Sequence, residues 1–215
     1  MPRPRVLLAD DHRLVVEACS GLLEPECEVV GIVTDGRALL PKAMAVRPDV
    51  IVLDIAMPLL NGLDAGRQLR HLTPDARLIF LTMNEDPELA KEALALGASG
   101  FLLKTSAARE LPEAIRAAMR GDTYVTSRAS QRMIQSFVQG GDRPPGGELT
   151  SRQREVLQLL AEGFTMKEAA GILHVTARTV AFHKYRVMQQ FRLKSNAELI
   201  QFVIDQRLTL AASQR

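Results

Sequence analysis

Residues 1–105 alternate short, almost wholly apolar runs with amphipathic stretches, and this alternation constrains the fold more than any other feature. The runs cover residues 5–9, 29–33, 50–53, 78–81 and 100–103. Runs that are apolar throughout are typical of strands buried on both faces of a sheet. Between the first two runs, apolar residues at helical spacing predict an amphipathic helix: Leu14, Val15, Ala18, Leu22 and Leu23. Five such units in succession predict an α/β fold, a flavodoxin-like doubly wound sheet of five parallel strands.

The helix after the fifth run contains a proline. Pro112 would break a helix that starts at Ala107, so we predict a start near Arg109 or Glu110, where a proline falls in the tolerated first turn. Gly121 suits the position just after the end of this helix, because glycine readily adopts the left-handed conformation found there.

The pattern changes after Gly121. Residues 127–138 predict one more helix, and residues 139–147 contain four glycines and two prolines, a composition typical of a linker. The sequence therefore predicts three parts: a first domain over residues 1–121, a linker with one helix over 122–147, and a second domain over 148–215.

The second domain shows helix starts and no strand pattern. Three starts have capping-box spacing, with Glu or Gln three residues after a hydroxyl: Thr150 and Gln153, Thr165 and Glu168, and Ser195 and Glu198. Thr176 is an N-cap residue for a fourth helix. Four short helices predict a small all-α domain.

Charge is divided unevenly along the chain. Residues 1–121 carry 14 Lys and Arg against 17 Asp and Glu, a balance of −3, whereas residues 148–215 carry 10 against 6, a balance of +4. Residues 122–147 carry 3 against 2, which completes the net charge of +2. A mildly acidic front and a basic back suggest separate tasks, with nucleic acid as one partner of the basic part.

Composition favours a cytoplasmic protein. The longest apolar runs are far shorter than the roughly 20 residues of a membrane span, so we expect no membrane partner. The first residues lack the apolar core of a signal peptide. Cys19 and Cys27 have no metal-ligand spacing and are interpreted as reduced packing residues.

Carboxylates follow two of the predicted strands. Asp10 and Asp11 follow the first strand and Asp54 ends the third, and these strands are neighbours in a sheet ordered 2-1-3-4-5. Two charges about 4 Å apart repel by about 4 kcal/mol at an effective dielectric of 20. Three carboxylates in one crevice would therefore raise their pKa values or capture a cation, and oxygen ligands favour Mg²⁺.

Two further polar residues end neighbouring strands. Thr82 ends the fourth strand and Lys104 follows the fifth. An aspartate held by a metal, a lysine and a hydroxyl can act as a nucleophile toward a phosphoryl group. The alternative, that aspartates at strand ends cap the following helices, accounts for one or two of these residues but not for all of them.

These residues resemble the receiver domain of two-component response regulators over roughly residues 4–121. The matching motifs are Asp10-Asp11-His12, Asp54 to Pro58 with Asn61-Gly62, Thr82, and Phe101 to Lys104. The resemblance implies that Asp54 accepts a phosphoryl group from a sensor histidine kinase. It also implies that Asp10, Asp11, Asp54 and the carbonyl of Ala56 hold Mg²⁺. Thr82 and Lys104 would bind phosphoryl oxygens, and Phe101 would be an aromatic switch, although a phenylalanine in a buried strand is also an ordinary core residue.

The second domain contains a predicted helix-turn-helix. Residues 165–173 and 176–190 form two helices joined by His174 and Val175, a turn of suitable length. The second helix would be the recognition helix, with its N-terminal part nearest the bases. We expect exposed side chains there, with Arg178, Lys184 and Arg186 suited to phosphate contact. The full set of candidate DNA contacts is Lys167, Thr176, Arg178, Thr179, Ala181, Phe182, His183, Lys184, Tyr185 and Arg186.

The stretch from Leu149 to His183 resembles the LuxR-type output domain, so the whole chain resembles a NarL/FixJ-type response regulator. It departs from the family pattern at Ala181, where a lysine is usual, and at Met166, where an asparagine is frequent. A lost lysine contact would cost about 1–3 kcal/mol if it reads a base. Phe182 and Tyr185 would instead contact thymine methyls or, especially for Phe182, pack inside the domain.

The last helix, over residues 196–207, is apolar around more than one face. Leu199, Ile200, Val203 and Ile204 form a stripe, and Phe202 flanks it. The surplus predicts a dimer contact, as the resemblance also implies for the phosphorylated protein, or packing of Phe202 on a neighbouring helix. A symmetric dimer would read paired half-sites in promoter DNA.

Three functions compete on these residues. The favoured one is a DNA-binding transcription regulator switched by phosphorylation at Asp54, without enzymatic turnover. An aspartate-nucleophile phosphohydrolase would need a second aspartate two residues after the first, where Ala56 stands. The third is a signalling protein that acts through protein contacts, with weak or no DNA binding.

Overall fold

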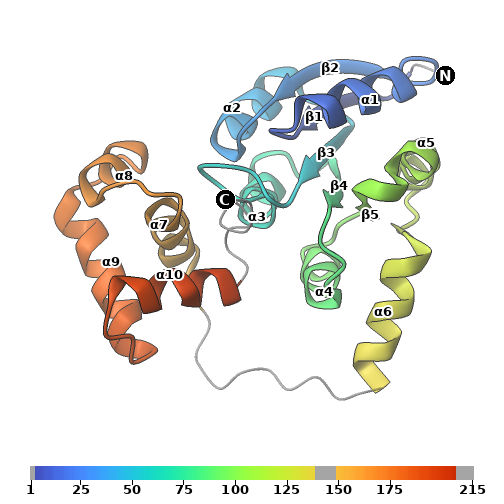
Figure 1. Cartoon of the computed structure of the whole chain (residues 1–215). Helices are drawn as coiled ribbons and strands as arrows, with labels where there is room; N and C mark the ends of the chain where they lie inside the picture. Colours follow the sequence, from blue (N-terminus) through green and yellow to red (C-terminus); the bar gives the residue numbers. More distant parts are fainter. Residues whose placement is uncertain (1–2, 139–148, 207–215) are drawn as a thin grey trace. The chain divides into compact units, whose positions relative to one another are not determined.

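The computed structural model describes residues 3–138 and 149–206, which form two compact units. The first contains β1 (Arg5–Ala9), α1 (Arg13–Leu23), β2 (Glu28–Val33), α2 (Gly36–Val46), β3 (Val50–Asp54), α3 (Gly62–Leu72), β4 (Arg77–Thr82), α4 (Pro87–Ala95), β5 (Gly100–Leu103), α5 (Lys104–Arg120), β6 (Tyr124–Val125) and α6 (Ser127–Val138). The second contains α7 (Ser151–Ala161), α8 (Met166–Ile172), α9 (Ala177–Gln190) and α10 (Asn196–Asp205) (Figure 1). The predicted linker, residues 139–147, lies outside the described residues.

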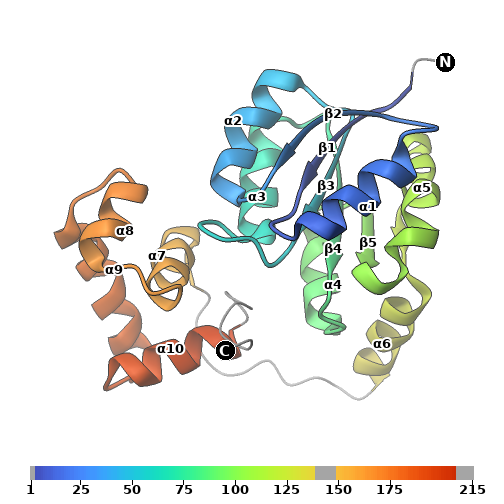
Figure 2. The ribbon, with the colours of Figure 1, turned by 45° about the horizontal axis from the view of Figure 1, so that its top comes forward.

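The first unit is a parallel sheet ordered β2-β1-β3-β4-β5-β6, which confirms the predicted doubly wound topology. Helices cover both faces, with α1 and α5 packed together on one and α2 and α3 on the other (Figure 2). The core on the α1 and α5 side includes Val52, Leu81, Leu102 and Leu111. Strand β3 is buried along its whole length, as its continuous apolar run predicts.

Two strands depart from the prediction of five strands buried on both faces. The sheet has a sixth strand, β6, in which Tyr124 and Val125 pair with Gly100 and Phe101. Two residues are too few to give a periodic signal. Strand β2 lies at the sheet edge and has no fully buried residue, because it has a neighbouring strand on one side only.

Helix α5 corrects the predicted start near Arg109. It begins at Lys104, directly after β5, and Pro112 lies inside it. Ala107, on the N-terminal side of the proline, and Leu111 and Ile115 are buried in the core. Burial of apolar side chains before and after Pro112 offsets the backbone bond that a proline cannot donate. The end is as predicted, with Gly121 in the left-handed conformation at φ 88°.

Helix α6 is confirmed over residues 127–138. Both β6 and α6 fall in the interval predicted as a linker, yet they belong with the first unit, because β6 extends its sheet and α6 contacts α4. Cys19 and Cys27 are buried, unpaired cysteines in the first core, as their interpretation as packing residues requires. No helix among the described residues is both long and apolar enough to cross a membrane.

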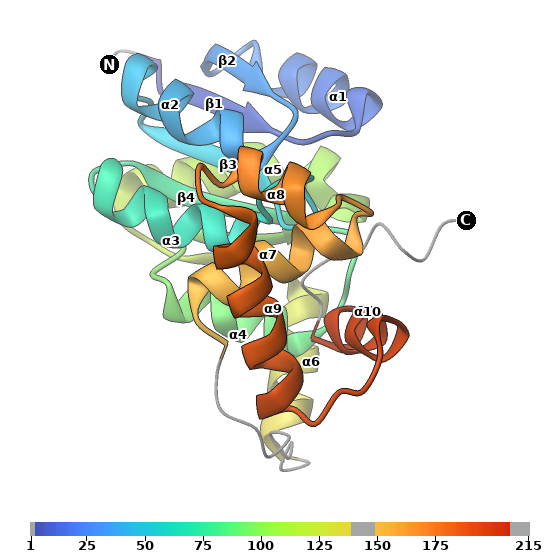
Figure 3. The same ribbon diagram turned by 90° about the vertical axis from the view of Figure 1, so that its left-hand side faces the viewer.

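The second unit consists of four helices with capped starts. The Thr150–Gln153 and Thr165–Glu168 capping boxes are complete. Ser195 caps Glu198, but the Glu198 carboxylate accepts from the Lys194 amide instead of closing a box. Helix α8 lies beside the start of α9, and α10 follows its end (Figure 3). Leu157, Val187, Leu199 and Val203 form one core cluster, and Val156, Ala169, Leu173 and Val180 belong to another.

Candidate functional site

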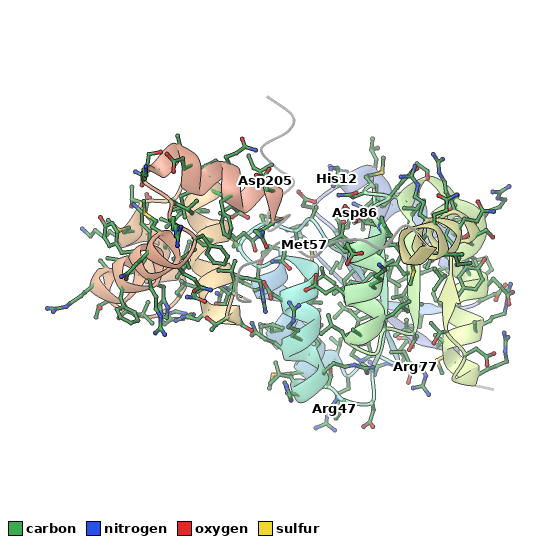
Figure 4. The ribbon with its side chains drawn as sticks, turned by 90° about the horizontal axis from the view of Figure 1, so that it is seen from below. His12, Arg47, Met57, Arg77, Asp86 and Asp205 are labelled. Carbon is green, nitrogen blue, oxygen red and sulfur yellow. The ribbon has the colours of Figure 1, made fainter. Side chains whose placement is uncertain are left out.

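The polar residues singled out in the first unit follow the strands at one edge of the sheet. His12 and Asp86, which come shortly after β1 and β4, lie toward this edge in Figure 4, and Arg47 and Arg77, which lie near the starts of β3 and β4, mark the opposite edge. Asp10 follows β1, Asp54 ends β3 and Thr82 ends β4. Parallel strands align their carboxyl ends, so residues far apart in the sequence meet there.

Lys104 joins the two inner carboxylates. Its Nζ lies 2.7 Å from Oδ2 of Asp10 and donates to Oδ2 of Asp54 at 2.8 Å. All three side chains are almost fully buried. The early start of α5 places Lys104 in the first helical position, directly after β5, from where it reaches both aspartates. The structure therefore brings together Asp10, Asp54 and Lys104 as the sequence predicts.

The charges of this cluster shift each other's pKa. Burial raises the pKa of the Asp54 carboxyl above its ordinary value and Asp10 adds to this, although Lys104 and the backbone N–H of Ala56 oppose it. Burial lowers the pKa of Lys104, but the two carboxylates outweigh burial and hold it above the ordinary value. Lys104 is thus a fixed cation, and Asp54 is a carboxylate held at a cost in free energy. Its Oδ1 is buried and accepts no hydrogen bond of ordinary geometry among the described residues.

Asp11 and His12 complete an acidic group on the outer side of Asp10. Asp10, Asp11, His12 and Asp54 each offer a ligand atom, and these atoms lie within 4.8 Å of one another. His12 Nδ1 lies 2.9 Å from Oδ1 of Asp11 and 3.2 Å from Oδ1 of Asp10. The sequence prediction did not give His12 a role, although its place directly after the two aspartates was the available signal.

The remaining predicted residues lie around Asp54. Thr82 is fully buried, and its Oγ1 accepts a hydrogen bond from the Asn84 amide at 3.0 Å. Phe101 is buried in β5 beside Phe80 of β4. Ala56 is half-buried, two residues past Asp54. Gly62 packs so closely that a Cβ there would lie 2.1 Å from the carbonyl oxygen of Asp54, which explains the need for glycine.

The loop after β4 is also tied to α6. Glu85, three residues past Thr82, forms an ion pair with Nε of Arg128 at 3.0 Å and a second, shorter one with Arg132. Both arginines come from α6. Strand order brings strand ends together but gives no position for α6, so the sequence did not predict this contact.

In the second unit, α9 has one inward and one outward face. Val180, Lys184 and Val187 are buried, whereas Arg178, Phe182, Tyr185 and Arg186 are exposed, as are Lys167 and Thr176 before them. Thr179, Ala181 and His183 lie between the two faces and are half-buried. The surroundings of His183 lower its pKa, first by burial and then through Arg152 and Arg186, which keeps the ring neutral near pH 7.

Two expectations about α9 are thereby decided. Lys184 was expected to be exposed, but it is only 8% exposed, because it lies one turn after Val180 and almost one turn before Val187 on the inward face. Its Nζ lies 5.2 Å from the ring centroid of Tyr185. Phe182 does not pack inside the domain: 57% of it is exposed, and Tyr185 is exposed to the same extent.

Most apolar side chains of helix α10 that exceed one face pack inside the second unit. Leu199 and Val203 are buried, and Phe202 packs against Phe191 with ring centroids 4.5 Å apart. Ile200 remains 39% exposed. The packing alternative therefore accounts for Phe202.

Comparison with known proteins identifies both units. A family model for the response regulator receiver domain matches residues 6–116, and one for bacterial regulatory proteins of the luxR family matches residues 147–203. The oxygen regulatory protein NreC of Staphylococcus carnosus (strain TM300) is 34% identical over 213 residues, which cover 95% of this chain and 98% of that protein.

Solved structures agree with this assignment. A structure of the RcsB response regulator of Salmonella typhimurium has a TM-score of 0.67 at 26% identity and covers 98% of this chain and 100% of its own. RcsB from Salmonella enterica serovar Typhimurium, bound to promoter P1flhDC in the presence of the phosphomimetic BeF3-, has a TM-score of 0.65 at 27% identity, with 95% and 100% covered.

The family regulates transcription and is not enzymatic, which excludes the phosphohydrolase alternative. A receiver unit with an aspartate cluster at its sheet edge is followed here by a helix-turn-helix unit, and both match their family models in this order. The chain therefore belongs to the NarL/FixJ-type two-component response regulators, with a receiver domain and a LuxR-type helix-turn-helix DNA-binding domain.

Proposed function

We propose that this regulator is switched by phosphorylation of Asp54 and that the switch controls binding of α9 to promoter DNA. The observation that carries the proposal is the state of the Asp54 carboxylate. Lys104 engages Oδ2, while Oδ1 is buried without a hydrogen bond of ordinary geometry among the described residues. A buried carboxylate oxygen without a well-aligned donor is costly to the fold and is the atom available to form a new bond.

The donor set around Asp54 fits Mg²⁺. Carboxylates of Asp10, Asp11 and Asp54 lie within reach of one another, and hard oxygen ligands suit this ion. We infer that these three residues and the Ala56 carbonyl hold it. When bound, Mg²⁺ neutralises negative charge on phosphoryl oxygens. The aspartates supply the negative charge that retains the cation, and Lys104 supplies a positive charge that does not depend on it.

The chain's own residues would then perform the transfer. Oδ1 of Asp54 attacks the phosphorus of a phosphohistidine on a sensor histidine kinase, a P–O bond forms, and the P–N bond breaks with its electron pair leaving on the imidazole. Lys104 and the Thr82 hydroxyl would donate to phosphoryl oxygens, and Thr82 can do so while its Oγ1 accepts from the backbone N–H of Asn84. Phe101, which lies on β5 two residues before the partner of Thr82 in the sheet, would change its packing as an aromatic switch.

The output would be a change in DNA binding by the second unit. Exposed Lys167, Thr176, Arg178 and Arg186 suit phosphate contact. The other candidates on α9 are exposed or half-buried, except Lys184, which is buried on the inward face. The solved structure of RcsB with promoter DNA supports this use of the domain. We further propose a homodimer in the phosphorylated state and a cytoplasmic location, where the kinase's phosphorylated domain and DNA are both available.

The test is DNA affinity with and without a phosphoryl mimic. Fluorescence anisotropy with a promoter library should show tighter binding when beryllofluoride and Mg²⁺ are added to the wild-type chain. Asp54→Ala should bind equally with and without these additions. Equal responses of both proteins would contradict the switch.

One observation favours the protein-contact alternative. The recognition helix presents fewer cations than expected, because Ala181 replaces a usual lysine and Lys184 is buried. Salt separates the two functions: a domain that contacts DNA phosphates must lose affinity steeply as salt rises. Binding to bulk DNA that is absent, or that does not respond to salt, would favour protein contacts.

A further inference from the structure

The outward face of α9 is aromatic at its centre. Residues three and four apart share a face of a helix, so Arg178, Phe182 and Tyr185 form one continuous stripe. This stripe lies opposite the inward face of Val180, Lys184 and Val187. The two rings occupy the middle of the helix surface that a helix-turn-helix directs into the major groove.

These rings are not explained by the fold. More than half of each is exposed, whereas most other large apolar side chains of the domain lie in two core clusters or pack against them. The nearest ring and cation interactions of Phe182 are with polar neighbours on α9. The His183 ring lies edge-on with its centroid 5.5 Å away, and the Arg186 guanidinium lies 5.8 Å from the centroid of the Phe182 ring. Exposed aromatic side chains flanked by cations match a ligand that is both apolar and anionic.

The chemistry of the stripe decides what it can read. Ala181 and Phe182 carry no side-chain hydrogen-bond donor or acceptor, so neither can recognise a base by hydrogen bonds. Thymine is the base that presents a methyl group in the major groove, and apolar side chains recognise it there. Arg178 and Arg186 are placed on the same exposed side to contact phosphates.

We propose that Phe182 and Tyr185 determine specificity by packing on thymine 5-methyl groups. This inference rests on DNA binding by α9. It assigns to this chain a preference for thymine at the positions under the two rings. A lysine at position 181, where this chain has alanine, would favour recognition of a base by hydrogen bonds. Removing one buried methyl group should weaken binding about four-fold.

The experiment compares thymine with uracil, which differs only by that methyl group. Sites are first selected from random duplex DNA by the full chain with beryllofluoride and Mg²⁺. Each selected thymine is then replaced by deoxyuridine, and dissociation constants are measured for the wild type, Phe182→Ala and Tyr185→Ala. Leu14→Ala is the control, because it removes an 80% exposed apolar side chain from the receiver unit.

We expect selected sites to contain thymines whose replacement weakens wild-type and Leu14→Ala binding by about four-fold each. Phe182→Ala or Tyr185→Ala should bind the two DNAs equally at the thymine under the missing ring. Salt-dependent binding with no penalty for uracil, or a penalty that survives both alanine substitutions, overturns the inference and leaves the proposed function intact. Failure to bind DNA at any salt concentration overturns both. Because the methyl group is removed from the DNA, the wild-type result does not depend on how the variants fold.

Discussion

Replacing Lys104 by methionine should strongly destabilise the receiver unit, because two buried carboxylates would lose the cation that pairs with them. Methionine retains a similar length but no charge. Nζ lies 2.7 Å from Asp10 and 2.8 Å from Asp54, with all three side chains at most 5% exposed. Each contact corresponds to about 6 kcal/mol of attraction at an effective dielectric of 20. Much of this offsets desolvation, so the net loss expected on removing one partner is about 3–5 kcal/mol.

The loss of stability in Lys104→Met should also depend on pH. Burial already holds the pKa of Asp54 above its ordinary value, and removing Lys104, which opposes this rise, would raise the pKa of Asp54 further. A carboxyl with a raised folded pKa contributes stability that is present below the unfolded pKa and lost as pH rises through the folded pKa. The deficit of Lys104→Met should therefore be largest near pH 7 and shrink toward pH 4.

Urea unfolding followed by tyrosine fluorescence measures the effect in one unit. The sequence has two tyrosines and no tryptophan, so in a Tyr185→Phe background the signal comes from Tyr124, which packs on the receiver core. Arg13→Met is the matched control, since it breaks an ion pair with Glu17 at 2.7 Å that is exposed to solvent. It should change stability little. A loss below about 1 kcal/mol for Lys104→Met, or one that does not shrink in acid, would refute the account of the cluster.

Three further predictions test other parts of the receiver unit. Gly62→Ala should destabilise it by about 2 kcal/mol in urea unfolding, because its Cβ would meet the Asp54 carbonyl, whereas Gly21→Ala, with nothing within 4 Å, should be neutral or stabilising. Glu85→Gln should speed amide hydrogen exchange in α6 by up to about five-fold, but Glu88→Gln, whose partner Lys91 lies in the same helix, should not. Burial raises the pKa of Cys19 from 9.0 to about 11, so stability should fall as pH rises from 9 toward 11, and Cys19→Ser should reduce that slope, to which Cys27 also contributes through its own raised pKa. A thermal midpoint of the wild type that stays constant over this range would contradict the last prediction.

The sequence predicted what depends on local pattern and on strand order. Apolar runs located five strands, and the parallel topology then placed Asp10, Asp54 and Lys104 at one edge. Where packing competes with a local rule, the prediction failed. Pro112 breaks isolated helices, yet α5 continues through it because apolar side chains before and after it are buried. The two-residue strand β6 forms only because β5 offers it a ladder.

The sequence also failed to predict which side of some helices faces the core. The apolar spacing in α1 included Leu14 and Ala18, but both are exposed, and Val16, Cys19 and Leu23 form the buried face. The helix is apolar enough on two sides that spacing alone does not choose between them. Lys184 is the converse case. The prediction placed every cation of α9 on the exposed face, but Lys184 lies on the buried face.

Asp54 was easy to identify from the sequence, but the free-energy cost of burying its carboxylate could not be predicted from it. A carboxylate at the end of a fully buried strand violates the preference for apolar residues there, so the sequence marks it clearly. Its cost depends on atoms that the sequence does not reveal: Lys104 binds one oxygen, and burial leaves the other without a partner of ordinary geometry among the described residues. Lys104 does not fully offset burial, since the pKa of Asp54 stays above its ordinary value. A partner that engaged both oxygens would stabilise the fold further but would remove the atom that we propose as the nucleophile. The incomplete pairing of Asp54 is therefore the point at which stability and the proposed switch make opposite demands on one side chain.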